Sequence, residues 1–213
     1  MLLEGKVAIV SGVGPGLGQA NAHALAREGA AVVLAARNAE YLAQVESEIT
    51  ASGGRALAVP TNLVDTDQVQ ALVDRTVREL GAIDILVNNA FRMDRGDPFE
   101  TAALDFWRKV YDVNVWGALG LTQACVPHLR QAAAERGDAS IVFILSMSMR
   151  KVRPNEGAYS TSKAALATAV QTLALELGPA HVRVNAVAPG WIGGPSVEIF
   201  IQWEAQNRTV EQD

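Results

Sequence analysis

Two residues four positions apart, Tyr159 and Lys163, are the pair in this chain best suited to proton transfer. In a helix this spacing puts both side chains on one face, one turn apart. A free tyrosine, with a pKa of about 10, is poorly matched to neutral pH. A nearby ammonium stabilises the phenolate and lowers that pKa, which makes the phenol a usable acid and base. The same spacing also arises by chance on half-exposed helix faces, so its surroundings must support the assignment.

Two serines lie upstream of this pair. Ser146 precedes Tyr159 by thirteen positions, and Ser148 stands two positions further on. Neither has a histidine in a triad-like motif, so a nucleophilic role is not favoured. A hydroxyl that holds a substrate oxygen is the better hypothesis for one of them.

A glycine-rich turn joins the first apolar segment to a helical one. Residues 7–10 are a short apolar run typical of a buried strand, and residues 19–28 have helical, alanine-rich spacing. A strand, a glycine turn and a helix in this order can bind a pyrophosphate, because the backbone approaches it closely and free helix N–H groups point at it. The unit therefore predicts a dinucleotide site.

The glycine spacing differs from the common G-x-G-x-x-G fingerprint, whose last glycine would fall at Gln19. The pattern that fits is G-x-x-x-G-x-G, through Gly12, Gly16 and Gly18. A glycine turn that binds no ligand is the alternative interpretation.

The elements that must position these residues alternate along the whole chain. We expect strands at 7–10, 32–36, 56–59, 83–87, 140–145 and 182–187, and helices at 19–28, 39–52, 65–80, 104–130 and 158–177. This alternation predicts an α/β fold, a single Rossmann-type doubly wound parallel sheet with helices on both faces. We expect one NAD(P)-binding domain over residues 1–213.

Polar or turn-forming residues follow all six expected strands. They are Ser11, Arg37, Asn62, Asn88 with Asn89, Ser146, and Pro189 with Gly190. Ligands of such sheets bind beyond the carboxyl ends of the strands. This placement predicts that the strand ends form one site.

Composition excludes several other classes of protein. A net charge of −5 without a basic stripe argues against a nucleic-acid partner. No apolar run approaches the roughly 20 residues of a membrane span, and no signal peptide precedes the first strand. A single cysteine, Cys125, fits a reducing compartment, so we expect a cytoplasmic protein with no membrane partner. We assign no metal ligands.

The combined motifs resemble the short-chain dehydrogenase/reductase family over residues 5 to about 195. They are the glycine turn with a serine ahead of it, Asn88-Asn89-Ala90, the helix asparagine Asn114, Ser146, Tyr159 with Lys163, and the segment 185–192. The resemblance implies hydride transfer between a nicotinamide cofactor and a carbonyl or secondary alcohol.

The resemblance also implies a role for each catalytic residue. Tyr159 is the general acid/base, and Lys163 lowers its pKa and binds the nicotinamide ribose. Ser146, preferred over Ser148 because of its offset from Tyr159, orients the carbonyl. Asn114 supports a water that links Lys163 to solvent.

The implied cofactor contacts lie at the strand ends. They are Gly12, Gly14, Gly16, Leu17, Gly18, Arg37, Asn62, Leu63, Asn89, Ala90, Tyr159, Lys163, Pro189, Gly190 and Ile192. A carboxylate after the second strand usually takes the ribose hydroxyls of NAD, but here Ala36 and Arg37 stand there. Since a guanidinium suits a 2′-phosphate, we favour NADP(H) over NAD(H).

Several positions depart from the family pattern. Phe91 replaces a glycine, Asn62 replaces an aspartate, and Gly194 stands where a threonine contact is common, a contact that Ser196 can supply. We expect the chain to lack the last strand and the C-terminal tail, with residues 193–213 forming a partial substrate lid.

Substrate identity stays open. Phe91, Ser148, Trp191 and Met147 are candidate pocket residues and suggest an apolar ketone or secondary alcohol. Four arginines, Arg92, Arg95, Arg150 and Arg153, offer the alternative of an acidic substrate.

Two further functions compete with an NADP(H)-linked oxidoreductase. One is a dinucleotide-binding sensor or shortened pseudoenzyme without turnover, and the other is epimerisation or dehydration with the same cofactor. A homodimer or homotetramer is expected, through the long helices that begin near Leu104 and Ala158.

Overall fold

Six short apolar segments form one parallel sheet in the computed structural model, which describes residues 1–194, 197–198, 201–202 and 205. The strands are β1 Val7–Ser11, β2 Ala31–Ala36, β3 Arg55–Pro60, β4 Ile85–Asn88, β5 Ala139–Ile144 and β6 Val182–Val187. Their order is β3-β2-β1-β4-β5-β6, so the order reverses between β1 and β4. Ser11 pairs with Ala35 of β2 and Asn88 of β4, which brings three strand ends level at this reversal.

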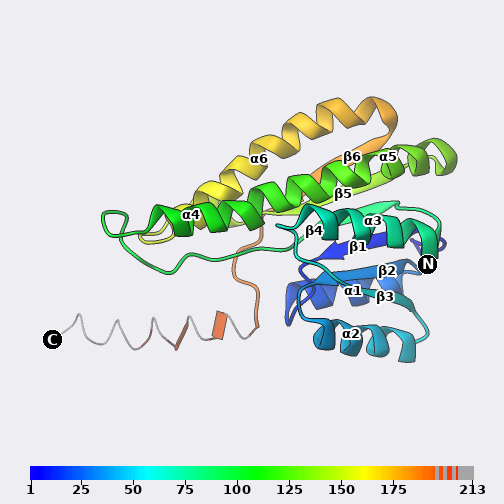
Figure 1. The fold of residues 1–213 in the computed structure, drawn as a ribbon, viewed down its shortest axis with the longest axis horizontal. Helices are drawn as coiled ribbons and strands as arrows, with labels where there is room; N and C mark the ends of the chain where they lie inside the picture. Colours follow the sequence, from blue (N-terminus) through cyan, green and yellow to red (C-terminus); the bar gives the residue numbers. More distant parts are fainter. Residues whose placement is uncertain (195–196, 199–200, 203–204, 206–213) are drawn as a thin grey trace.

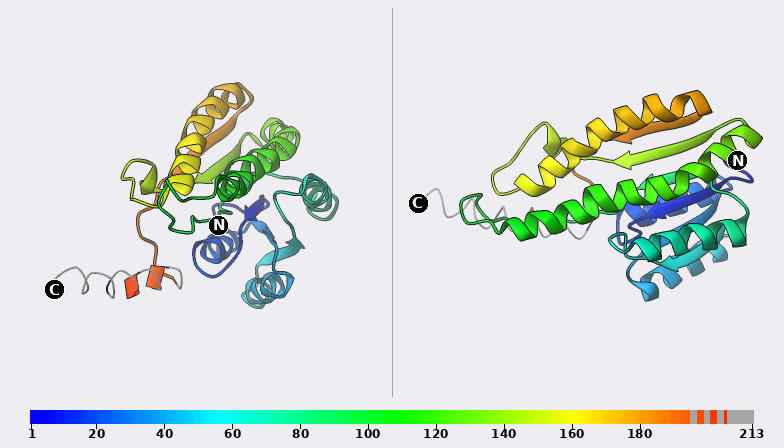
Figure 2. Two further views of the ribbon diagram at one scale, coloured as in Figure 1. Left: turned by 60° about the vertical axis from the view of Figure 1, so that its left-hand side comes forward. Right: turned by 45° about the horizontal axis from the view of Figure 1, so that its top comes forward.

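Helices cover both faces of the sheet, and the predicted fold class is confirmed (Figures 1 and 2). They are α1 Leu17–Arg27, α2 Ala39–Ala51, α3 Thr66–Leu80, α4 Leu104–Tyr111, α5 Ala118–Arg136 and α6 Gly157–Leu177. Val7 and Ile9 of β1 pack with α3, α5 and α6, while Ala8 and Val10 pack with α1 and α2. This alternation along a strand buried on both faces explains the continuous apolar runs.

The prediction of one regular helix over 104–130 is wrong in two respects: the helix is interrupted, and it ends later than expected. A π-helical turn, η1 Asp112–Gly117, separates α4 from α5, and α5 continues to Arg136 before Gly137 ends it at φ 92°. Such a wide turn inserts a residue into the helix, and it occurs often at functional sites. Here it places the buried side chain of Asn114 against two other segments.

The outer edge of β6 is open within the described part of the chain, where β6 pairs with β5. Most of the lid predicted for residues 193–213, and Ser196 with it, lies outside the described residues. Within the described residues, no helix is long and apolar enough to cross a membrane.

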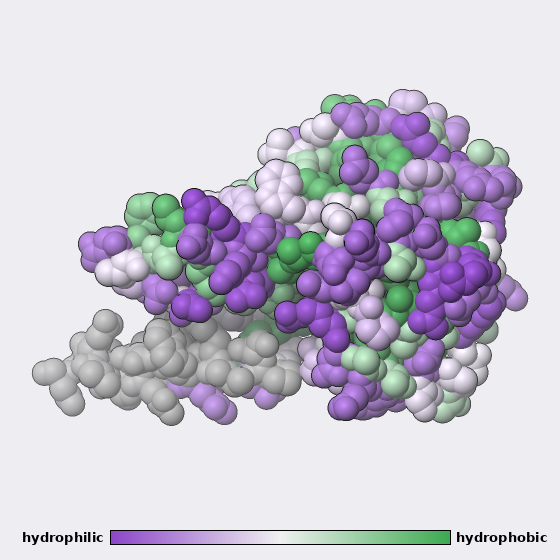
Figure 3. All heavy atoms as spheres, in the orientation of Figure 1, coloured by the Kyte–Doolittle hydropathy of each residue, from purple (hydrophilic) through white to green (hydrophobic). Residues whose placement is uncertain are grey.

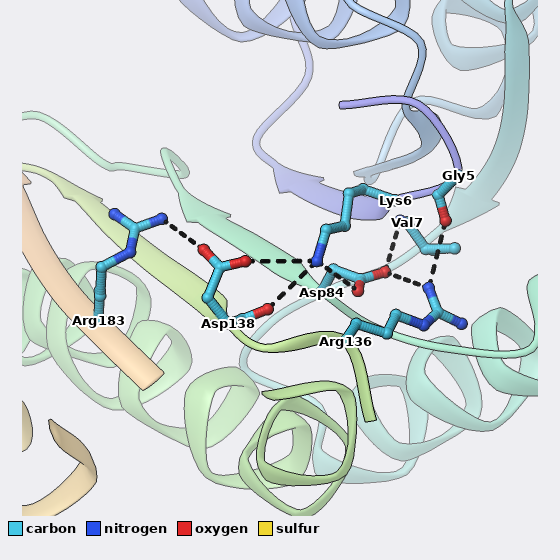
Figure 4. Close-up of polar contacts among 7 residues, drawn as sticks. All are labelled: Gly5, Lys6, Val7, Asp84, Arg136, Asp138 and Arg183. Atoms are coloured by element: carbon cyan, nitrogen blue, oxygen red, sulfur yellow. Dashed lines mark hydrogen bonds and ion pairs between the residues drawn. The ribbon is translucent and has the colours of Figure 1, made fainter. Parts of the chain in front are cut away.

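A cluster of charges around the buried Asp84 lies at the amino ends of the strands, opposite to the ends with the predicted site (Figure 4). Asp84, fully buried, accepts hydrogen bonds from the Val7 N–H at 2.8 Å and from Arg136 Nη1 at 2.9 Å. Lys6 Nζ lies 3.4 Å from carboxylate oxygens of both Asp84 and Asp138. The cluster therefore joins β1, β4 and the end of α5.

We expect Asp84→Ala to lower the free energy of unfolding by about 3 kcal/mol or more. The substitution leaves Arg136 and Lys6 without their buried partner, and the loss of one member of a buried ion pair costs this much. Asp138→Ala is the matched control, because Asp138 is about half exposed and should cost about 1 kcal/mol at most. Urea unfolding measures both, and equal losses would contradict the central role of Asp84.

Candidate active site

Close packing at the ends of β1 and β4 requires glycine at two positions of the turn. Gly12 has φ +74°, and a Cβ there would lie 2.4 Å from the Ala90 Cα. A Cβ on Gly18 would lie 2.3 Å from the Gly12 carbonyl oxygen. Asn89 Nδ2 donates to the Gly12 carbonyl at 2.8 Å and to the Ser11 carbonyl at 3.1 Å. The Asn-Ala segment after β4 therefore fixes the shape of the glycine turn.

The start of α1 leaves room and hydrogen-bond donors for an anion. A Cβ on Gly14 or Gly16 would meet no atom within 4 Å. Gly16 is the N-cap of α1 and provides no side-chain cap, and no acidic residue lies in the first turn. The amides of Leu17 and Gly18 have no acceptor among the described residues. Free amides and the positive end of the helix dipole fit a pyrophosphate.

The ends of β2 and β3 border this turn. Arg37 follows β2, is exposed, and forms no hydrogen bond or ion pair with the described residues. Asn62, after β3, accepts the Val64 N–H at 3.3 Å through its own side chain. Leu63 lies next to Gly117 of η1. The Arg37 side chain is therefore available to a ligand. The Asn62 side chain is already engaged in the turn after β3.

Tyr159, Ser146 and Lys163 come together between the end of β5 and the first turns of α6. The Ser146 hydroxyl lies close enough to the Tyr159 phenol to lower its pKa, and Ser148 Oγ donates to Ser146 Oγ at 2.9 Å. Of the two serines, Ser146 is the one that influences the phenol, and its catalytic role stays a prediction. Lys163 Nζ lies 5.7 Å from the centroid of the Tyr159 ring and donates to the Ile144 carbonyl at 2.7 Å.

The chain alone does not produce the lowered tyrosine pKa that we expected from the sequence. Burial raises the pKa of Tyr159, the nearby Ser146 hydroxyl lowers it, and the charge of Glu156 raises it further. Burial also lowers the pKa of Lys163 to about 8. The expected effect of Lys163 on the phenol is not seen, because burial dominates and the lysine is bonded to the Ile144 carbonyl.

Asn114 connects three segments from within the π-helical turn. Its Oδ1 accepts the Arg92 N–H at 2.6 Å, and its Nδ2 donates to the Arg92 carbonyl at 3.0 Å and to Ser162 Oγ at 2.9 Å. Ser162 belongs to α6, one residue before Lys163. Asn114 is thus near the predicted partners, and its side chain holds the loop after β4. A water relay through Asn114 stays a prediction.

Aromatic side chains surround the phenol and the loop after β6. Phe91 is 52% exposed, and its ring meets the Tyr159 ring edge-on at 6.2 Å. Trp191 is 58% exposed, and the Arg153 guanidinium lies over its ring at 4.7 Å. The Pro189 carbonyl accepts the Met147 N–H at 3.0 Å, which ties the loop before Gly190 and Ile192 to the segment after β5.

One contact at this site has no signal in the sequence. Asp94, in the loop between β4 and α4, accepts the backbone N–H of Tyr159 at 2.7 Å. Sixty-five residues separate the two, and a lone aspartate in a polar loop gives no signal of a contact at that range.

Comparisons with known proteins agree with this geometry. A family model described as short chain dehydrogenase matches residues 6–205. The 7α-hydroxysteroid dehydrogenase of Escherichia coli K12 is 34% identical over 209 residues, which cover 98% of this chain and 80% of that protein.

Solved structures give the same answer. A 3-ketoacyl-(acyl-carrier-protein) reductase from Brucella melitensis, complexed with NADH, matches with a TM-score of 0.83 and 33% identity over 88% of this chain and 76% of its own. An NAD+-bound xylitol dehydrogenase matches with a TM-score of 0.87 and 33% identity over 97% of this chain and 76% of its own. With the glycine turn, the Ser146–Tyr159 pair and Lys163 at the strand ends, these matches establish that the chain belongs to the short-chain dehydrogenase family.

Proposed function

We propose that this protein is an oxidoreductase that transfers hydride between NADP(H) and a carbonyl or secondary alcohol. The observation that carries the proposal is the gathering of Ser146, Tyr159 and Lys163 after β5 and in the first turns of α6, where Lys163 Nζ lies 5.7 Å from the centroid of the Tyr159 ring. These groups lie beyond the same strand ends as the free amides of Leu17 and Gly18, which suit the diphosphate of a dinucleotide.

The side chains act on the substrate oxygen. Ser146 and Tyr159 hold that oxygen between two hydroxyls, and in the reductive direction Tyr159 donates its proton to it. Lys163 stays largely protonated below its pKa of about 8, so its charge favours the phenolate left behind. When bound, the nicotinamide supplies or accepts the hydride. A positive oxidised nicotinamide would add to Lys163 and oppose the effect of burial on the phenol.

The mouth of the site favours an apolar substrate. Phe91, Trp191 and Met147 present exposed apolar surface there. Arg92 and Arg95 lie over the Phe106 ring, at 5.1 and 4.6 Å, and are therefore less available to an acidic group. The relatives' names range from a hydroxysteroid to an acyl-carrier-protein substrate, and they agree only on carbonyl and alcohol chemistry.

A titration and a substrate panel test the proposal. NADPH and NADH are titrated with detection of nicotinamide fluorescence, and a panel of ketones and secondary alcohols is then assayed with the cofactor that binds. Binding with turnover of at least one carbonyl compound is expected. Binding without any turnover would favour the sensor, and the absence of binding would reject both.

We expect Arg37→Ala to weaken NADPH binding by roughly 10- to 100-fold and NADH binding by about twofold at most. A hydrogen bond to a charged group is worth about 1.5–3 kcal/mol, and only NADPH carries the 2′-phosphate. Arg27→Ala, an exposed arginine at the end of α1, is the control and should change neither affinity. Equal losses for the two cofactors would remove the case for NADP(H).

We also propose that the protein is a homodimer or homotetramer in the cytoplasm. Figure 3 shows hydrophobic residues on the surface over the layer of α5 and α6, and Leu175 of α6 is 80% exposed. An apolar helix face of this kind suits contact with a second copy. The single cysteine, Cys125, is fully buried, and a chain without a disulfide suits a reducing compartment.

A further inference from the structure

The helix that carries the phenol has no cap of its own. α6 begins at Gly157, so Ala158 and Tyr159 are its second and third residues. Its N-cap residue, Glu156, forms no hydrogen bond from its side chain to the first turn. Amides in the first turn of a helix have no acceptor within the helix, and a buried end needs one from elsewhere.

Asp94 supplies that acceptor from a distant segment. Its Oδ2 accepts the Tyr159 N–H at 2.7 Å. A carboxylate at the amino end of a helix is favoured by the helix dipole as well as by this hydrogen bond. The cap thus reaches the residue that carries the phenol.

The segment that contains Asp94 is also fixed beside the phenol. Asn114 holds both backbone groups of Arg92, and the ring of Phe91 meets the ring of Tyr159. One short loop is therefore joined to three places: to η1 through Arg92, to the Tyr159 ring through Phe91, and to the Tyr159 backbone through Asp94. This loop and the first turn of α6 form a single unit around the phenol.

We propose that Asp94 is a positioning residue for the reaction, which holds the first turn of α6 against the loop after β4 and so fixes the Tyr159 hydroxyl relative to the substrate oxygen. This inference rests on the proposed function, in which Tyr159 transfers the proton. Errors of about 1 Å in such a group cost roughly 100-fold in rate.

Several charged groups face Asp94 from the loop and from the segment before α6. Burial raises its pKa, the amides of Tyr159 and Ala158 oppose this, and Asp97 on the same loop raises it further. Glu156, from the segment before α6, is a second acid close by, and Arg153 offsets part of its charge.

Three variants test the proposal. Asp94→Ala removes the acceptor, Asp94→Asn keeps an uncharged acceptor, and Asp97→Ala removes an exposed acid three positions along the same loop. For Asp94→Ala we expect kcat to fall roughly 10- to 100-fold, with the KM for NADPH changed by about twofold at most. Asp94→Asn should recover most of kcat, and Asp97→Ala should match the parent.

Amide hydrogen exchange reports the cap without any assay of activity. In Asp94→Ala, exchange in the first turn of α6 should be faster than in the parent, and Asp94→Asn should restore slow exchange. Unchanged exchange in Asp94→Ala, or faster exchange with the kcat of the parent, would overturn the inference. A parent that binds NADPH but turns over no carbonyl compound would count against the proposed function alone, and the exchange result would still decide whether Asp94 holds the helix.

Discussion

Tyr159→Phe is expected to lower kcat by about 1,000-fold while changing the Kd for NADPH by about twofold at most. The substitution removes one oxygen, and general acid–base catalysis by a positioned group is worth about 100- to 10,000-fold. The ring stays, so its edge-on contact with Phe91 and the packing of α6 are kept. Single-turnover kinetics and fluorescence titration separate the two quantities.

Tyr111→Phe is the matched control for this substitution. Tyr111 is the last residue of α4, and none of the described contacts of the site involves its hydroxyl. The kcat of Tyr111→Phe should equal that of the parent. A Tyr159→Phe variant that binds NADPH poorly but turns over at the parental rate would exclude Tyr159 as the proton donor.

The fold follows from local patterns that the sequence carries in full. Asp65 was expected near the start of a helix, and its side chain accepts from the amides of Asp67 and Gln68. Gly81, at φ 85°, ends the same helix. Strands buried on both faces are continuous apolar runs, so their number and order along the chain could be predicted. Their pairing order comes from the structure, which gives β3-β2-β1-β4-β5-β6.

The contacts within the site were harder to predict, because they join residues far apart in the chain. Asn114, in the π-helical turn, bonds to Arg92 and Ser162, and no local pattern encodes these contacts. The cap of Asp94 on α6 has the same origin. The direction of the Tyr159 pKa depends on its burial, which an i, i+4 spacing does not contain. Local chemistry therefore predicted which residues gather, and tertiary packing decides how they act.

Under the proposed function, Lys163 is a residue kept for chemistry at a cost to stability. It is 2% exposed, and burial lowers its pKa from 10.5 to about 8. Its ammonium donates to the Ile144 carbonyl, and no carboxylate pairs with it among the described residues. The pKa falls by about 2.5 between the unfolded and the folded chain. At about 1.4 kcal/mol for each unit of pKa, the buried ammonium therefore lowers the free energy of unfolding by about 3 kcal/mol.

We therefore expect Lys163→Met to be more stable than the parent at pH 7 and to lose at least about 100-fold in kcat. Removal of the buried charge recovers about 3 kcal/mol, and loss of the bond to Ile144 costs about 1 kcal/mol, so the net gain is about 2 kcal/mol. In the parent, the buried charge lowers stability fully below pH 8, where Lys163 stays protonated in the folded chain. This cost decreases as the pH rises towards 10.5, where Lys163 also loses its proton in the unfolded chain. The gain should accordingly shrink between pH 8 and 10.5, as measured by urea unfolding at a series of pH values.

Lys109→Met, at an exposed position of α4, should change neither stability nor kcat. A Lys163→Met variant less stable than the parent at pH 7 would mean that the ammonium stabilises the fold. The trade-off argued for Lys163 would then be wrong, because a lysine that stabilises the fold needs no catalytic reason to be buried. A variant that is more stable and inactive would instead tie the buried charge to the proton transfer by Tyr159.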